Sequence, residues 1–280
     1  MRRPPRGRGS RAATRRVSEN RSVPRESIEV LFEPPPPEAD ARIVYGPESL
    51  QFGDLRLPSG DGRHPLVVFV HGGYWQAIYN LTHAGHLCVD LAEHGVATWN
   101  VEYRRIGDPG GGWPAALDDV LLALDHVRAL ARDHPLDLER IVVMGHSAGG
   151  QLALLSCLRT ELPVRGAVSL AGVVDPAEIA RLGDDNGVIE RMLGGGPEEL
   201  PEVWREASPR SNLPLGFPYV LACGTADIHW GPNEVVADEA VAAGDDAELL
   251  PLPGAGHFEL VDPVAPEWAV IREKVQALLL

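Results

Sequence analysis

The sequence predicts an α/β domain in which a mostly parallel, twisted sheet carries helices on both faces. From Arg42 onward, short β-branched runs alternate with amphipathic helical stretches, the pattern of a parallel sheet covered by helices. Residues 66–70 form a continuous apolar run of the kind that is buried on both faces. A Gly-x-Ser-x-Gly motif at 145–149 comes directly after one predicted strand and directly before a predicted helix.

The predicted elements of the first half follow from local signals. Apolar residues recur at helical spacing over 81–91, and Gly95 ends that helix before a strand at 96–101. Pro114 opens a longer helix. Its apolar side chains fall on one stripe: Leu117, Val120, Leu121, Leu124 and Val127.

The second half repeats the alternation. A strand at 141–144 precedes the serine motif, and a helix at 151–158 follows it. Further strands are predicted at 167–170, 219–223 and 248–252, with a helix at 232–243 that Gly244 ends and a closing amphipathic helix. The closing helix presents its apolar residues on one side: Trp268, Ile271, Val275 and Leu278.

Two segments depart from this pattern. Residues 1–25 contain nine arginines and almost no apolar side chains, so we predict a disordered tail and a single domain over 26–280. Residues 175–216 are rich in glycine, proline and charge. We expect this stretch to be a short insertion over the carboxyl edge of the sheet, where a lid would lie.

Composition excludes several classes of function. The 280 residues include 40 acidic and 25 basic ones, and the net charge of −15 disfavours binding to nucleic acid. The three cysteines, Cys88, Cys157 and Cys223, match neither a disulfide framework nor a zinc site. No apolar run is long enough to span a bilayer, and the Arg-rich start lacks the apolar segment of a secretory signal. We therefore expect a cytoplasmic protein that does not bind membranes.

Ser147 is the predicted nucleophile. A serine at the crest of a strand-to-helix turn needs small neighbours two residues before and after it, and Gly145 and Gly149 supply them. The start of the following helix favours negative charge near the serine. The same glycines do not have the spacing of a dinucleotide-binding fingerprint.

A serine nucleophile needs a base and an orienting carboxylate. His257 lies in a loop after the strand at 248–252, and Asp227 lies in the loop after the strand at 219–223. The chain order Ser147, Asp227, His257 is the order expected when such a triad is built on a parallel sheet. Asp175 is the reserve candidate for the acid, and Asp262 is a weaker one.

The loop after residues 66–70 supplies the remaining part of the site. Gly72 and Gly73 allow backbone N–H groups to approach a substrate oxygen closely, and the N–H of Ala148 follows the nucleophile. These three residues form a predicted oxyanion hole. Tyr74 and Trp75 are expected to line the substrate pocket, together with His146. A further group, His83, His86 and Cys88, is better explained by a helix than by a metal site.

The motif His71-Gly72-Gly73-Tyr74-Trp75 resembles the H-G-G-x-W signature of the arylformamidase and esterase group of the α/β-hydrolase superfamily. The resemblance covers the chain from about Ile43 onward. It implies an α/β-hydrolase fold, and it implies that the amides of Gly72 and Gly73 stabilise the oxyanion. Tyr74 and His146 stand where hormone-sensitive-lipase relatives usually have Gly and Asp, which disfavours that branch.

These observations predict a serine hydrolase that cleaves carboxylic esters with small acyl groups and needs no metal or organic cofactor. An arylformamidase that hydrolyses N-formyl aryl amides is the alternative, because both reactions pass through the same kind of tetrahedral intermediate. A peptidase and a ligand-binding protein without turnover are weaker alternatives. The expected partner is a small ester or amide, and the sequence leaves the oligomeric state open.

Overall fold

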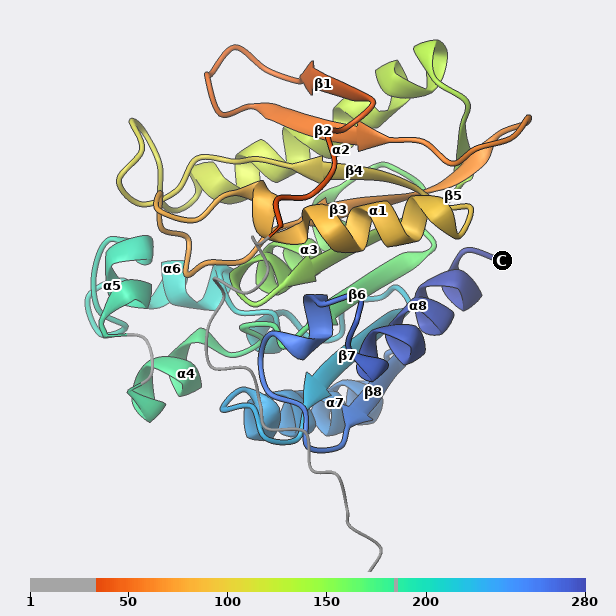
Figure 1. Cartoon of the computed structure of the whole chain (residues 1–280). Helices are drawn as coiled ribbons and strands as arrows, with labels where there is room; N and C mark the ends of the chain where they lie inside the picture. The colour runs from red at the N-terminus through yellow and green to blue at the C-terminus, as the bar shows by residue number, and fades with distance from the viewer. Residues whose placement is uncertain (1–33, 184–185) are drawn as a thin grey trace, which may run out of the picture.

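The computed structural model describes residues 34–183 and 186–280, so the predicted tail at 1–25 lies outside the described residues. The described chain forms an eight-stranded sheet with helices on both faces (Figure 1). The strands are β1 (Ala41–Val44), β2 (Phe52–Arg56), β3 (His64–Val70), β4 (Ala97–Val101), β5 (Leu136–His146), β6 (Gly166–Leu170), β7 (Tyr219–Gly224) and β8 (Ala247–Leu252).

The strand order is β1-β2-β4-β3-β5-β6-β7-β8. β2 pairs antiparallel with β1 and β4, and the pairs from β4 to β8 are parallel, which confirms the mostly parallel sheet. The six predicted strands all appear, although β5 begins five residues before the predicted start. β1 and β2 were not predicted. In β2, Asp54 is buried and pairs with Arg42 of β1 at 2.7 Å. A charged residue at a buried position interrupts the apolar pattern by which a strand is recognised in a sequence.

Helices cover both faces of the sheet. α1 and α8 pack on one face, and α2, α3 and α7 pack on the other (Figure 1). α3 begins directly after Ser147, three residues earlier than predicted. The helices are α1 (Gly85–Glu93), α2 (Ala115–Asp133), α3 (Ala148–Arg159), α4 (Pro176–Leu182), α5 (Val188–Leu193), α6 (Pro201–Glu206), α7 (Trp230–Ala243) and α8 (Pro266–Leu278), with short 3-10 helices η2 (Leu81–Ala84), η3 (Arg210–Asn212) and η4 (Glu259–Val261).

β3 shows why the central strands are apolar throughout. Val67 and Phe69 belong to the core under α1 and α8, whereas Val68 and Val70 belong to the core under α2 and α3. All four side chains are fully buried. Because neither face of the strand meets water, the alternation of polar and apolar residues is absent.

The parallel strands end at a common edge, and the loops that follow them meet there. The insertion after β6 folds into α4, α5 and α6 at this edge (Figure 1). That the insertion acts as a lid stays a prediction. Among the described residues, no helix combines the length and the apolar character needed to cross a membrane.

Candidate active site

Ser147 occupies a tight turn between β5 and α3. Its backbone has a φ of 55° and a ψ of −118°, a strained conformation for a residue with a side chain. A Cβ atom at Gly145 would lie 2.1 Å from the carbonyl oxygen of Gly149, and one at Gly149 would lie 2.1 Å from that of Val70. Both positions therefore require glycine, as the motif predicts.

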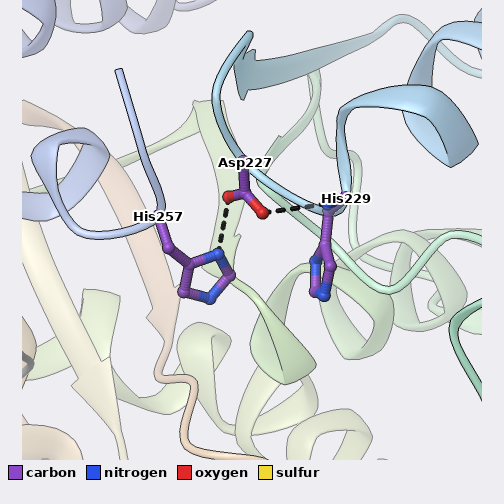
Figure 2. Close-up of side chains that lie close together, drawn as sticks. All are labelled: Asp227, His229 and His257. Carbon is purple, nitrogen blue, oxygen red and sulfur yellow. Dashed lines mark hydrogen bonds and ion pairs between the residues drawn. The ribbon is translucent and has the colours of Figure 1, made fainter. Parts of the chain in front are cut away.

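Asp227 and His257 lie in the loops that follow β7 and β8 (Figure 2). The Nδ1 atom of His257 donates a hydrogen bond to Oδ2 of Asp227 at 2.7 Å, and the N–H of His229 donates to Oδ1 at 2.9 Å. A carboxylate can only accept, so Nδ1 of His257 carries a proton, and Nε2 is the ring nitrogen that can act as a base.

The Asp227 carboxylate is ionised although its side chain is almost completely buried. Burial alone raises its pKa, but the electrostatic interaction with the nearby His257 and the hydrogen bonds from His257 and His229 together lower the pKa below its usual value. The imidazole of His257 is more accessible, with 23% of its side chain exposed. The imidazole is therefore accessible to a small molecule, whereas the carboxylate is not.

The structure brings neither alternative acid to His257. Asp175 caps α4 by accepting from the N–H of Glu178 at 3.2 Å, and it pairs with Arg210 at 2.8 Å. Asp262 accepts from the N–H of Val264 at 3.1 Å. Among the three carboxylates considered from the sequence, Asp227 is the one in contact with His257.

The two glycines after β3 lie beside the serine. A Cβ atom at Gly72 would lie 3.1 Å from Cβ of Ser147, so the backbone of Gly72 closely approaches the turn. Gly73 has a φ of 110°, and a Cβ there would lie 2.4 Å from Cβ of Tyr79. Ala148 opens α3, where the N–H groups of the first turn have no acceptor within the helix.

A cavity of about 60 Å³ opens at this point of the sheet edge. Its lining combines the serine and the histidine with aromatic side chains. The lining residues are Gly73, Tyr74, Tyr79, His146, Ser147, His257 and Phe258.

Trp75, which the sequence predicts in the pocket, is not among the residues that line this cavity. Trp75 is 1% exposed and packs in the core, because Gly73, Tyr74 and Trp75 all have positive φ and this turn directs the indole inward. Tyr79 and Phe258 line the cavity instead. Phe258 directly follows His257, the predicted base, in the sequence, which could have indicated it, whereas Tyr79 carries no comparable signal.

A family model described as BD-FAE matches residues 54–229, more than half of the chain. The chain belongs to the BD-FAE family. The matched segment begins in β2 and ends at His229, so it includes the serine turn and Asp227.

Curated relatives of this BD-FAE chain are mostly esterases. Esterase LipC of Mycobacterium tuberculosis is 28% identical over 249 residues, which cover 79% of this chain and 60% of LipC. Isoprenylcysteine alpha-carbonyl methylesterase ICME of Arabidopsis thaliana is 34% identical over 78% of this chain and 56% of its own. A kynurenine formamidase of Meyerozyma guilliermondii is 32% identical over 113 residues, 40% of each chain. The chain thus spans 60% or less of the length of these relatives.

Solved structures show the same fold. A bacterial heroin esterase is 26% identical, with a TM-score of 0.71 over 82% of this chain and 80% of its own. Esterase B from Lactobacillus rhamnosis is 18% identical, with a TM-score of 0.77 over 90% and 91%. The predicted α/β-hydrolase fold is confirmed for this member of the BD-FAE family.

Three further histidines of the BD-FAE chain form a buried group behind the serine turn. The ring of His83 lies 5.9 Å from that of His71 and 5.6 Å from that of His146, and the ring of His146 lies 4.6 Å from that of His257. Burial and the neighbouring His71 lower the pKa of His83 to about 3. Burial, with His257 and His83, holds the pKa of His146 well below 6.5. His83 and His146 are therefore neutral at physiological pH.

Asp227, His229 and His257 each place one potential metal-ligand atom within 4.8 Å of the others (Figure 2). In this BD-FAE chain each of the three side chains already takes part in a hydrogen bond. The 2.7 Å bond joins Asp227 to His257, and Nδ1 of His229 lies 2.7 Å from the carbonyl oxygen of Ala171. The Nδ1 atoms of both histidines are therefore already in hydrogen bonds.

Proposed function

We propose that the protein is a serine hydrolase that cleaves carboxylic esters with small acyl groups. One observation carries this proposal. Ser147 and His257 line the same small cavity, and the Nδ1 atom of that histidine is held by the buried carboxylate of Asp227 at 2.7 Å. The esterases among the curated relatives and solved structures support the same reaction class.

The proposed reaction begins when Oγ of Ser147 attacks the ester carbonyl and its proton passes to Nε2 of His257. Asp227 stabilises the imidazolium that results. The N–H groups of Gly72, Gly73 and Ala148 hold the developing oxyanion. The imidazolium then protonates the leaving alcohol, and water, activated by the same base, hydrolyses the acyl-enzyme.

The cavity supports a small acyl group. A volume of about 60 Å³ is well below the several hundred Å³ of typical ligand pockets. Tyr74, Tyr79 and Phe258 narrow it with flat apolar walls. The net charge of −15 disfavours highly anionic substrates.

A second candidate is hydrolysis of N-formyl aryl amides. Two observations favour it: the His71-Gly72-Gly73-Tyr74-Trp75 motif and the similarity to a kynurenine formamidase over 113 residues. The triad alone does not choose between ester and formamide. Leaving-group fit and protonation by His257 decide.

We place the reaction in the cytoplasm. Cys88, Cys157 and Cys223 are all buried free thiols, and burial raises the pKa of each. Such cysteines are compatible with a reducing compartment.

The test compares kcat/KM on an aryl acetate, a long-chain aryl ester and N-formylkynurenine, with Ser147→Ala as the control for serine-dependent turnover. We expect the aryl acetate to be preferred over the long-chain ester by at least about tenfold, since each extra methylene that does not fit removes binding energy. A preference for the long-chain ester contradicts the small-acyl proposal. Turnover of the formamide alone replaces the esterase assignment with the second candidate.

A further inference from the structure

His146 connects three parts of the site. It is the last residue of β5, directly before Ser147, and its imidazole is 1% exposed. The ring lies 4.6 Å from the ring of His257. On its other side, a Cβ atom at Gly72 would lie 3.1 Å from Nδ1 and 2.7 Å from the carbonyl oxygen of His146. The residue therefore touches the predicted oxyanion loop, the nucleophile turn and the base loop.

The contact with the base loop is a hydrogen bond. Nε2 of His146 lies 3.0 Å from the backbone carbonyl oxygen of His257. A carbonyl only accepts, so Nε2 carries the proton and donates. Two other hydrogen bonds of this loop do not reach β5. The carbonyl of Ala255 accepts from the N–H of Ala226, and the N–H of Gly256 donates to the carboxylate of Glu259. The bond from His146 ties the base loop to the strand that carries the nucleophile.

Packing alone does not account for an imidazole at this position. Nδ1 of His146 is buried without a hydrogen-bond partner, and a buried polar atom without a partner destabilises the fold. An apolar side chain of similar volume would fill the space without that cost. What an apolar side chain could not supply is the donor at Nε2.

The charge state of the ring also suits this position. His257 becomes an imidazolium in each cycle of the proposed reaction, and a second cation 4.6 Å away would oppose that step. The titratable groups around His146 are His83, His257 and His229, and burial together with these neighbours keeps the pKa of His146 well below 6.5. A neutral donor can therefore hold the base loop without repelling the charged base.

We propose that His146 is a positioning residue: its hydrogen bond to the carbonyl of His257 fixes the base loop so that Nε2 of His257 faces Ser147. The inference rests on the proposed serine-hydrolase function. Its consequence is that removal of the donor lowers the rate of the chemical step and leaves substrate binding nearly unchanged.

The experiment uses two amide variants that differ in reach. In His146→Gln the amide nitrogen lies near the position of Nε2, whereas in His146→Asn it stops near the position of Nδ1. We expect Asn to lower kcat on the aryl acetate by about 10- to 100-fold with KM within about twofold, and Gln to restore most of the loss. His94→Asn, at the exposed end of α1, is the matched control and should retain the wild-type rate.

A second measurement does not need turnover. We expect the proton on Nδ1 of His257, bonded to Asp227, to give a proton NMR signal in the wild-type protein. This signal should broaden or shift in the Asn variant and be preserved in the Gln variant. If the Asn variant does not fold, His146→Met, which fills the space without a donor, takes its place in both measurements.

Equal losses in the Gln and Asn variants would assign the effect to packing of the ring and overturn the inference. An Asn or Met variant with the wild-type kcat and an unchanged Nδ1 proton signal would overturn it as well. A wild-type protein that cleaves no ester or formamide would contradict the proposed function instead, and the NMR comparison would still decide whether His146 positions the base.

Discussion

Asp227→Asn is the substitution whose effect follows most directly from the geometry. Asp227 accepts two hydrogen bonds, from Nδ1 of His257 at 2.7 Å and from the N–H of His229 at 2.9 Å. In the Asn variant, the amide oxygen can keep the bond to His229, so the loop keeps its shape. The amide NH₂ group then faces His257, and Nδ1 must become an acceptor.

This change selects the wrong tautomer of the base. With Nδ1 deprotonated, Nε2 carries the proton and cannot take one from Ser147. We expect kcat to fall about 10⁴-fold, which corresponds to about 5 kcal/mol of transition-state stabilisation. The measurement is kcat on an aryl acetate at about pH 7.5, above the ordinary pKa of histidine, with circular dichroism to show that the fold is retained.

Asp175→Asn is the matched control. Asp175 caps α4 and pairs with Arg210. Asparagine is an equally good cap, and the lost ion pair contributes little because it is partly exposed. The kcat of this variant should therefore stay within about threefold of the wild-type value. The reasoning is refuted if Asp227→Asn retains more than about a tenth of the wild-type kcat, or if Asp175→Asn causes the larger loss.

Three further outcomes are expected. Burial lowers the pKa of His83 to about 3. The unfolded chain therefore takes up a proton on this residue below about pH 6.5, whereas the folded chain takes it up only near pH 3. The free energy of unfolding falls over this range, by about 2 kcal/mol at pH 5. In His83→Leu the difference in unfolding free energy between pH 7 and pH 5 should shrink by about that amount, and urea titrations that show an unchanged difference would contradict this. Gly149→Ala should destabilise the fold by about 2 kcal/mol or more, because its Cβ would lie 2.1 Å from the carbonyl oxygen of Val70. Gly231→Ala is the control, since a Cβ there has no atom within 4 Å. Equal melting temperatures of the two variants would count against the turn geometry. Phe258→Ala should open the cavity and raise kcat/KM for a butyrate ester relative to an acetate by about tenfold; an unchanged ratio would show that Phe258 does not limit acyl size.

Much of the fold could be predicted because its central strands are buried on both faces. The apolar run at 66–70 and the glycines at 145 and 149 mark their structures locally, and the strand and the tight turn both lie where the pattern indicates. β1 and β2 could not be found in this way. They are short, and the buried charge of Asp54 is compensated by Arg42, a partner that only the folded sheet supplies.

The same distinction separates the site residues that the sequence could predict from those that it could not. Ser147, Asp227 and His257 follow strands, and strand ends can be located from the sequence. The walls of the cavity depend on irregular backbone: three successive residues with positive φ direct Trp75 into the core, and Tyr79 reaches the cavity from a loop. No periodicity encodes those directions.

The central claim, that Ser147 is a nucleophile activated by His257, is tested most directly by covalent labelling. The protein is incubated with a fluorophosphonate, and its intact mass is measured before peptide mapping. We predict one phosphonyl group per chain, located on Ser147, with no labelling of Ser147→Ala and labelling slowed by about 10³-fold or more in His257→Ala. An unlabelled wild-type protein, a label on another residue, or labelling of His257→Ala at the wild-type rate would contradict the account.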